Sequence, residues 1–318
     1  MKVVLPVVVL LAAAAVVAVY LDYRRDMDHA LERISAGSLI AQTRCGPIEY
    51  ASAGEGIPVL IVHGAGGGID QGMDAAKSLV SAGFRVIAMS RFGYLRTPLP
   101  ADASPEAQAD AHACLLDALG IARAAIIGAS AGAPSSMQFA LRHPDRCSAL
   151  VLLVPAVYVP RPGGAPSLKT PPWTEFLFDT SLRSDFLFWA SIRLAQRTLV
   201  GAILATPPEV LEKADPEEQA RAAQMLEHTL PVSARRLGLL NDARVTSALP
   251  RYDLERIRAP TLAISVADDR FGTYDAARYT AEHIRGARFV GYPTGGHVWI
   301  GRHKDMLGEI AALLRSAP

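Results

Sequence analysis

Short apolar runs alternate with longer amphipathic stretches along most of this chain. From Ser38 onward, the runs are rich in Val, Ile, Leu and Ala and are too short for helices, which is typical of buried strands. They occur at Val59–Val62, Arg85–Met89, Ala124–Ile127, Leu150–Val154, Thr261–Val266 and Ala287–Val290. Helical patterns fall between them, so the sequence predicts an α/β fold with a mostly parallel central sheet flanked by helices.

The helix predicted at Pro105–Leu119 is marked at both ends. Ser104 precedes it as a suitable N-cap, Pro105 fits the first helical position, and Gly120 follows the last turn. A second helical pattern covers Ala131–Arg142. These signals predict two helices that connect successive strands of the sheet.

The alternation stops between Pro155 and about residue 258. This stretch opens with a segment rich in Pro and Gly, then becomes helical and aromatic, with Trp173 among its aromatic residues. About a hundred residues is too long for a bare loop in a compact domain. The sequence therefore predicts a helical cap at 155–258, inserted between two core segments at 38–154 and 259–318.

The amino terminus has a different composition. Val3–Leu21 is uncharged and almost entirely Val, Leu and Ala, and its length is close to the ~20 residues that span a bilayer. Residues 1–22 are thus predicted to be a transmembrane anchor or a signal peptide, followed by a polar, partly helical connector at 23–37. The bulky Val19–Leu21, with no clear A-x-A site, favours an uncleaved anchor. The alternative is a secreted or periplasmic protein, and the side of the membrane is not determined by the flanking charges.

Composition narrows the function classes further. The 318-residue chain has a formal net charge of +1 with both signs interspersed, so no nucleic-acid partner is expected. Its three cysteines, Cys45, Cys114 and Cys147, show no CxxC spacing. We interpret them as small buried hydrophobic residues rather than as disulfide partners or metal ligands, and we expect neither a metal nor an organic cofactor.

Ser130 is the strongest candidate for chemistry. It lies within Gly128-Ala-Ser-Ala-Gly132, directly after a predicted strand and before a predicted helix. A serine between small residues at such a turn is held with its hydroxyl exposed at the end of the sheet. The pattern predicts that Ser130 is a nucleophile.

A serine hydroxyl needs a base and a group that orients that base. His297 lies in a Gly-rich loop after the last predicted strand, where an imidazole can reach the sheet edge. Asp268 and Asp269 follow the strand Thr261–Val266 and fall between serine and histidine in sequence. Either carboxylate fits the orienting role on this evidence.

The segment from His63 to Gly68 is rich in glycine and follows the strand Val59–Val62. Backbone N–H groups free of side chains can hold the oxyanion of a tetrahedral intermediate. We expect one donor from Ala131 and one from Ala65, with Gly66 as the alternative. A phosphate-binding role is disfavoured because neither a third Gly nor a Gly-Lys-Ser/Thr follows. His63 is predicted to support this loop through hydrogen bonds.

Together these segments resemble the α/β-hydrolase fold family over about residues 38–316. The match rests on His63-Gly64-x-Gly66, Gly128–Gly132, Asp268-Asp269-Arg270 and Gly295-Gly296-His297. In similar members the acid is the second of such a pair, so the resemblance implies Asp269, with Asp268 as the fallback.

The resemblance also implies where a substrate pocket lies. Arg91-Phe92-Gly93-Tyr94 looks like the family's loop that lines the pocket, although Ser90 stands where many relatives carry Asp. The pocket candidates are His63, Phe92, Tyr94 and Trp173.

These residues predict a serine hydrolase that cleaves a carboxylic ester through an acyl-enzyme. The aromatic cap and the apolar N-terminus favour a lipophilic acyl substrate presented near a membrane. The same triad also serves C–C bond hydrolysis, amide or prolyl cleavage and cofactor-free perhydrolysis, and the fold does not choose among them. A membrane-tethered binding protein without turnover is a further alternative.

Overall fold

A single eight-stranded sheet forms the centre of the molecule, in the order β1-β2-β4-β3-β5-β6-β7-β8. The computed structural model describes residues 4–160 and 179–317. Strand β1 pairs with β2 in antiparallel orientation, and β2 pairs with β4 in the same way. The other six strands, β3 to β8, are all parallel to their neighbours within this group. The strands are β1 (Leu39–Thr43), β2 (Gly46–Ala53), β3 (Ile57–Val62), β4 (Phe84–Met89), β5 (Ala124–Ala129), β6 (Cys147–Leu153), β7 (Thr261–Val266) and β8 (Arg288–Tyr292). The predicted sheet is confirmed, with an antiparallel hairpin added at one edge.

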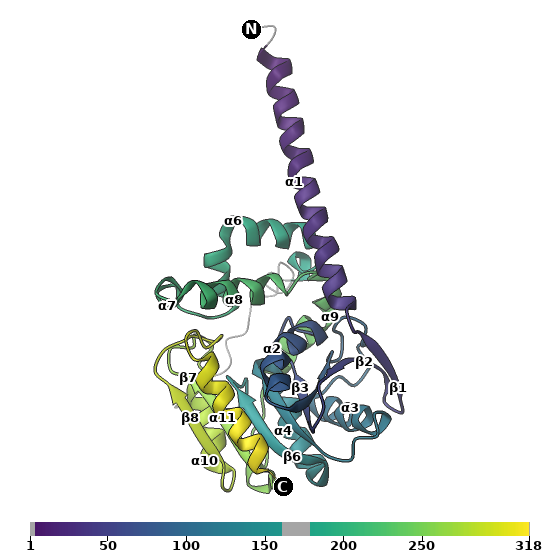
Figure 1. The fold of residues 1–318 in the computed structure, drawn as a ribbon, viewed down its shortest axis with the longest axis vertical. Coiled ribbons are helices and arrows are strands. Elements are labelled where there is room, and N and C mark those ends of the chain that lie inside the picture. Colours follow the sequence, from purple (N-terminus) through teal and green to yellow (C-terminus); the bar gives the residue numbers. More distant parts are fainter. Residues whose placement is uncertain (1–3, 161–178, 318) are drawn as a thin grey trace.

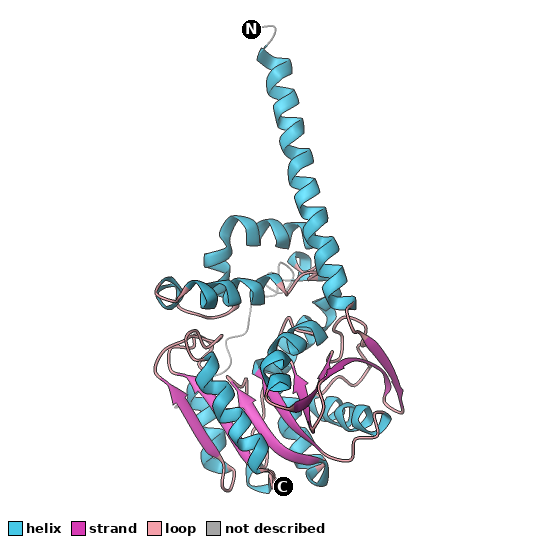
Figure 2. Ribbon diagram, in the orientation of Figure 1, coloured by secondary structure: helices cyan, strands magenta, loops and turns pink. Residues whose placement is uncertain are grey.

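Helices cover both faces of this sheet (Figure 2). Apolar residues of α2 and α11 pack on one face, and those of α3, α4 and α10 pack on the other. These helices are α2 (Ile69–Ser81), α3 (Pro105–Ala118), α4 (Ala133–Arg142), α10 (Thr273–His283) and α11 (His303–Ser316). Strands β3, β5, β6 and β7 are buried on both faces, which explains their continuous apolar sequences.

The described residues between β6 and β7 include four further helices, on the side of the sheet from which the N-terminal helix extends (Figure 1). They are α6 (Asp185–Ile203), α7 (Pro208–Glu212), α8 (Pro216–Glu227) and α9 (Arg236–Thr246). We refer to these four helices as the cap. They fall within the stretch in which the strand–helix alternation stops.

The N-terminal helix α1 (Val4–Ser35) is longer than the sequence pattern suggested. Residues 23–35, which the sequence predicted to be a partly helical connector, continue it without a break. Tyr23, Met27 and Ala30 are spaced four and three residues apart, and all three pack into an apolar cluster formed mainly by the cap. This packing stabilises the helix beyond its apolar part. Among the described residues, α1 alone is long and apolar enough to cross a membrane, and its apolar window is not buried.

The interpretation of the cysteines is corrected by the structure. Cys45, in the turn between β1 and β2, forms a disulfide with Cys114 of α3, with the two Cα atoms 6.1 Å apart. The hairpin folds against α3 and brings together residues 69 positions apart, which local spacing does not reveal. Cys147 is free and buried, as expected.

Candidate active site

Ser130 occupies a sharp turn between β5 and α4. Its φ is +48°, in the left-handed region that non-glycine residues rarely adopt, and it begins a single 3₁₀ turn. The neighbouring glycines are sterically required. A Cβ at Gly128 would come within 2.5 Å of Ser136 Oγ, and one at Gly132 within 2.5 Å of the Val62 carbonyl oxygen. The small residues therefore let the turn close against the sheet and the helix.

A line of hydrogen bonds joins Ser130 to a histidine and an aspartate. His297 Nε2 lies 3.0 Å from Ser130 Oγ, and His297 Nδ1 lies 2.8 Å from Asp269 Oδ2. Asp269 is buried at the end of β7 and also accepts hydrogen bonds from the backbone N–H of Phe271 and the hydroxyl of Thr273. With these contacts Asp269 can fix the Nδ1–H tautomer, which leaves Nε2 free to accept the serine proton.

Asp268 has a different environment from Asp269. Its Oδ1 accepts hydrogen bonds from the backbone N–H groups of Gly295 and Gly296, at 3.0 and 2.7 Å. It thereby holds the Gly-rich segment that precedes His297. The structure brings Asp269, rather than the fallback Asp268, into contact with the imidazole.

The glycine-rich loop after β3 lies directly beside Ser130. A Cβ at Gly64 would come within 3.2 Å of Ser130 Cβ, so a larger residue here would press on the serine. The N–H of Gly66 donates to Tyr94 Oη at 3.2 Å and is therefore occupied. Ala65 is exposed, and its N–H has no partner among the described residues. Ala131 follows Ser130 in the first turn of this helical segment, where N–H groups lack helical acceptors.

His63 and Tyr94 lie behind this loop rather than facing a pocket. His63 Nδ1 donates to the Gly64 carbonyl at 2.7 Å, and Nε2 accepts the N–H of Arg91 at 3.0 Å. Burial lowers the pKa of His63 well below 6.5, and nearby Arg91 lowers it further, so the ring is neutral. Tyr94 is fully buried and donates to Asp242. Both side chains hold the loop from within.

Two buried ion pairs connect the cap to the same loop. Arg91 is paired through both terminal nitrogens with Asp242 of α9, at 2.6 Å each, and donates to the carbonyls of His63 and Gly64. Sequence analysis missed this contact because the two partners are 151 positions apart.

The second pair joins Arg235, just before α9, to Asp70 at the start of α2. Its nitrogens lie 2.8 and 3.2 Å from the carboxylate oxygens, and Arg235 also donates to the Gly67 carbonyl at 2.6 Å. Burial alone would raise the pKa of Asp70, but Arg235 and Arg33 outweigh it and the net pKa is lowered. The carboxylate is therefore ionised, and the loop is fixed at both ends by guanidinium groups.

The remaining pocket candidates are Phe92 and Trp173. Phe92 and Ala131 line a small cavity of about 20 Å³ between the N-terminal end of α3 and α9. Trp173 lies outside the described residues. The exposed ring of Phe271, which sequence analysis did not single out, stacks edge-on against His297 with centroids 4.8 Å apart.

Comparison with known proteins identifies the family. Residues 57–300 match the family model described as the alpha/beta hydrolase fold. The chain belongs to the α/β-hydrolase fold family.

Among solved structures, this α/β-hydrolase is similar to an alpha/beta hydrolase fold protein from Nakamurella multipartita. The two share 30% sequence identity with a TM-score of 0.70, over 87% of this chain and 99% of the other. Among curated proteins, it is 28% identical to the uncharacterized hydrolase YcgS of Bacillus subtilis (strain 168), over 83% of this chain and 93% of that protein.

A further relative has a named substrate. The 2-hydroxy-6-oxononadienedioate/2-hydroxy-6-oxononatrienedioate hydrolase of Paraburkholderia xenovorans (strain LB400) is 31% identical, over 79% of this chain and 84% of its own length. These relatives support hydrolase chemistry for this α/β-hydrolase.

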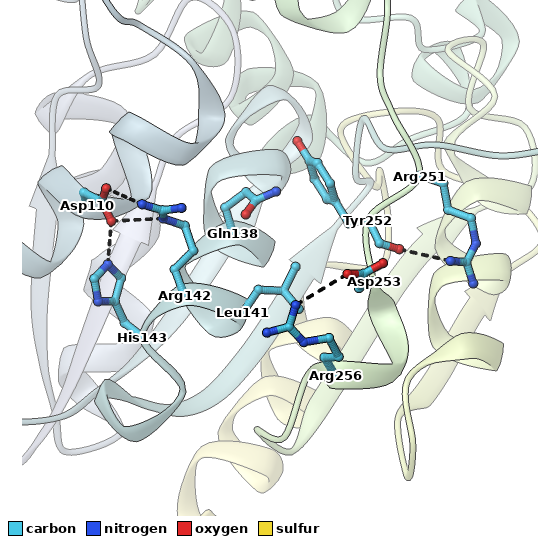
Figure 3. A pocket seen from close by; sticks show the side chains of 9 residues that line it. All are labelled: Asp110, Gln138, Leu141, Arg142, His143, Arg251, Tyr252, Asp253 and Arg256. Atoms are coloured by element: carbon cyan, nitrogen blue, oxygen red, sulfur yellow. Dashed lines mark hydrogen bonds and ion pairs between the residues drawn. The ribbon is translucent and has the colours of Figure 1, made fainter.

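A larger cavity of about 590 Å³ lies elsewhere in the hydrolase (Figure 3). Its wall includes Gln138, Leu141 and Arg142 at the C-terminal end of α4, whereas Ser130 precedes the N-terminal end. Its arginines are all paired with carboxylates, Arg142 with Asp110, Arg256 with Asp253 and Arg251 with the neighbouring Glu255. This surface cavity is thus separate from the serine and offers little unneutralised charge.

Proposed function

We propose that this protein is a serine hydrolase that cleaves a neutral carboxylic ester through an acyl-enzyme. Ser130 attacks the carbonyl carbon while His297 accepts its proton and then delivers that proton to the leaving alcohol. Asp269 orients His297 and stabilises the imidazolium. A water molecule, deprotonated by the same histidine, then releases the acid. The hydrogen-bonded line from Ser130 to His297 to Asp269 is the observation that carries this proposal.

The oxyanion of each tetrahedral intermediate is held by the N–H groups of Ala65 and Ala131. The occupied N–H of Gly66 favours Ala65 over Gly66 as the loop donor. Removing one such donor typically costs about 3–4 kcal/mol of transition-state stabilisation. The hydrogen bonds from Arg91 and Arg235 to the loop carbonyls keep these donors in place.

Charge around the loop favours a neutral substrate. The two guanidinium groups that contact the loop are each paired with a buried aspartate, Arg91 with Asp242 and Arg235 with Asp70. Neither is free to bind a substrate carboxylate without breaking a buried pair. An ester needs no such cation.

The apolar part of α1 supports a lipophilic acyl substrate. It is long enough to anchor the chain in a bilayer. We propose that it does so and that the hydrolase acts next to lipid, on a substrate such as a medium-chain ester or a monoacylglycerol.

Hydrolysis of a C–C bond is the second candidate, favoured by the relative from Paraburkholderia xenovorans. A dienoate substrate of that kind carries carboxylates, which would need cationic partners. The paired state of Arg91 and Arg235 favours the ester.

A substrate comparison with the full chain in detergent tests the proposal. We expect turnover of p-nitrophenyl esters, with a chain-length optimum, and little turnover of a 2-hydroxy-6-oxo-dienoate. Ser130→Ala should abolish ester turnover and labelling by a fluorophosphonate, whereas Ser316→Ala, at an exposed serine, should change neither. Preferential turnover of the dienoate would replace the ester proposal, and inert wild-type protein would refute both.

A further inference from the structure

Helix α6 of the cap contacts α1 just beyond the apolar part of α1. The ring of Tyr23 lies edge-on to Phe186 and Trp189, with centroid distances of 5.2 and 5.5 Å. Trp189 Nε1 and Arg193 both donate to Asp26, at 2.8 and 2.6 Å. These contacts hold α6 against the turn of the N-terminal helix that contains Tyr23 and Asp26.

That level coincides with the end of the uncharged segment. Leu21 is its last residue, and Tyr23 follows two residues later, which corresponds to about 3 Å along a helix axis. The segment from Val4 to Leu21 is itself about 27 Å long, close to the ~30 Å of a bilayer's hydrocarbon core. With this segment in a bilayer, α6 meets α1 where the hydrocarbon ends and the headgroups begin.

Helix α6 extends sideways from α1, and its first half lies on the side of the cap toward the N-terminus (Figure 1). Its inner residues Trp189 and Ile192 are buried in the cluster that includes α8 and α1. The opposite face carries the exposed apolar side chains of Leu187, which is 58% exposed, and Leu194, which is 88% exposed, and Phe186 lies between the two faces with 41% exposure. Leu187 and Leu194 are seven residues apart and so share one face of the helix.

We propose that residues 185–194 of α6 form an interfacial helix, whose outer face lies in the headgroup layer of the same bilayer that α1 crosses. The aromatic side chains next to the apolar face and the exposed Arg193 fit this layer, where aromatic rings and long basic side chains are favoured. The proposal rests on the anchoring role of α1 and is independent of which bond the enzyme cleaves.

A bilayer explains this face better than a second copy of the chain does. The lipid surface is already positioned by α1, and its contact with α6 needs no rearrangement of the cap. A bilayer also gives the exposed leucines an apolar environment. Among the described residues it leaves no charge at this level without a partner, because Arg25 pairs with Asp22 and Arg193 pairs with Asp26. Anchoring and cap position are then coupled through Asp26.

Site-directed labelling tests this geometry without using activity. The full chain is reconstituted into vesicles of phosphatidylcholine and phosphatidylglycerol, with a fluorophore on Leu194→Cys. The control carries it on Glu282→Cys of α10, an exposed position at the opposite end of the molecule (Figure 1). The native cysteines do not compete, because Cys147 is buried and Cys45 is paired with Cys114.

We expect lipid-attached quenchers to act at least about threefold more strongly on position 194 than on position 282, as for an interfacial helix. Iodide in the aqueous phase should show the opposite order. Equal quenching at the two positions would overturn the proposal. Protection of position 194 that disappears when the protein is diluted in lipid would also overturn it, in favour of contact between two copies.

A pair of substitutions provides a second readout. Leu187→Asp with Leu194→Asp should raise the exposure of a label on Ser191→Cys, between them, to aqueous iodide. Leu237→Asp, at an exposed leucine of α9, should leave that exposure unchanged. If the aspartates leave the label as protected as before, α6 does not lie in lipid. None of these outcomes depends on ester hydrolysis, so failure here and failure of the proposed function are distinguishable.

Discussion

The core and the cap contribute to the candidate site in different ways. Every proposed catalytic group comes from the core, and each lies within a few residues of a strand end: Ser130 after β5, Asp269 after β7 and His297 after β8. The cap contributes support through contacts between residues more than a hundred positions apart, as in the pairs Arg91–Asp242 and Asp70–Arg235. The chemistry thus depends on local turns, whereas the attachment of the cap depends on buried charge.

The largest effect should come from the core. Asp269→Asn retains the shape of the side chain but favours the wrong histidine tautomer, and we expect kcat for ester hydrolysis to fall by about 10⁴. Asp268→Asn is the matched control. It can still accept one backbone hydrogen bond, so its loss should be about tenfold or less. Steady-state kinetics on both variants would contradict this assignment if the two losses were reversed.

The next effect tests the attachment of the cap. Asp242→Ala leaves the buried Arg91 without its partner and removes the acceptor of Tyr94, and it should lower the free energy of unfolding by about 3–5 kcal/mol. Urea unfolding of the full chain in detergent measures it. The control is Asp253→Ala, which breaks the exposed pair with Arg256 and should leave stability unchanged. Similar unfolding midpoints for the two variants would show that the buried pair does not hold the cap.

A smaller effect depends on pH and on the core alone. Burial, with smaller contributions from Arg91 and His143, lowers the pKa of His112 to about 3, so the folded protein keeps this ring neutral while the unfolded chain protonates it near pH 6.5. Its contribution is complete above pH 6.5 and is lost as the pH falls toward 3, by about 1.4 kcal/mol per pH unit.

Urea unfolding between about pH 7.5 and pH 4.5 measures this slope. His112→Gln should make the loss of stability on acidification shallower, whereas His29→Gln, at an exposed position of α1, should leave it unchanged. An unaltered slope in His112→Gln would rule out this histidine as a source of acid sensitivity.

The smallest effect compares two helix N-caps of the same kind. Ser104 accepts the N–H of Ala107 at the start of α3, and Ser184 accepts that of Leu187 at the start of α6. Ser104→Ala should lower the free energy of the main unfolding transition by about 1 kcal/mol. Ser184→Ala should instead increase proteolysis within the cap and leave that transition unchanged. Equal shifts of the main transition would mean that core and cap unfold as one unit.

The same contrast explains what the sequence could predict. The strands and helix starts could be predicted because each depends on residues close together in the chain, and Ser130, His297 and the acidic pair were singled out as candidates for the same reason. The edge hairpin of β1 and β2 was missed because its strands are only partly apolar and partly exposed. The pairing of Cys45 with Cys114 was missed because the fold brings these residues together across 69 positions.

Buried polar contacts between distant segments could not be predicted from the sequence for the same reason. Nothing near Arg91 indicates that Asp242 is its partner, and nothing near Ser90 indicates that its hydroxyl donates to Glu49 of β2, at 2.6 Å. The continuation of α1 had a detectable signal in Tyr23, Met27 and Ala30, whose spacing is helical although the charged residues between them suggested a connector.

The uninterrupted helix α1 also sets a distance. Arg33 near its end bonds to Asp70, which directly follows the glycine-rich loop, with Nε and Oδ2 3.1 Å apart. Twelve residues separate Leu21 from Arg33, which corresponds to about 18 Å along the helix axis. With the apolar segment in a bilayer, the proposed nucleophile Ser130 is therefore held at a fixed height above the hydrocarbon. A water-soluble ester can reach the serine by diffusion from the aqueous phase. A membrane lipid must instead leave the hydrocarbon and move past the cap, over a distance that is set by the length of α1.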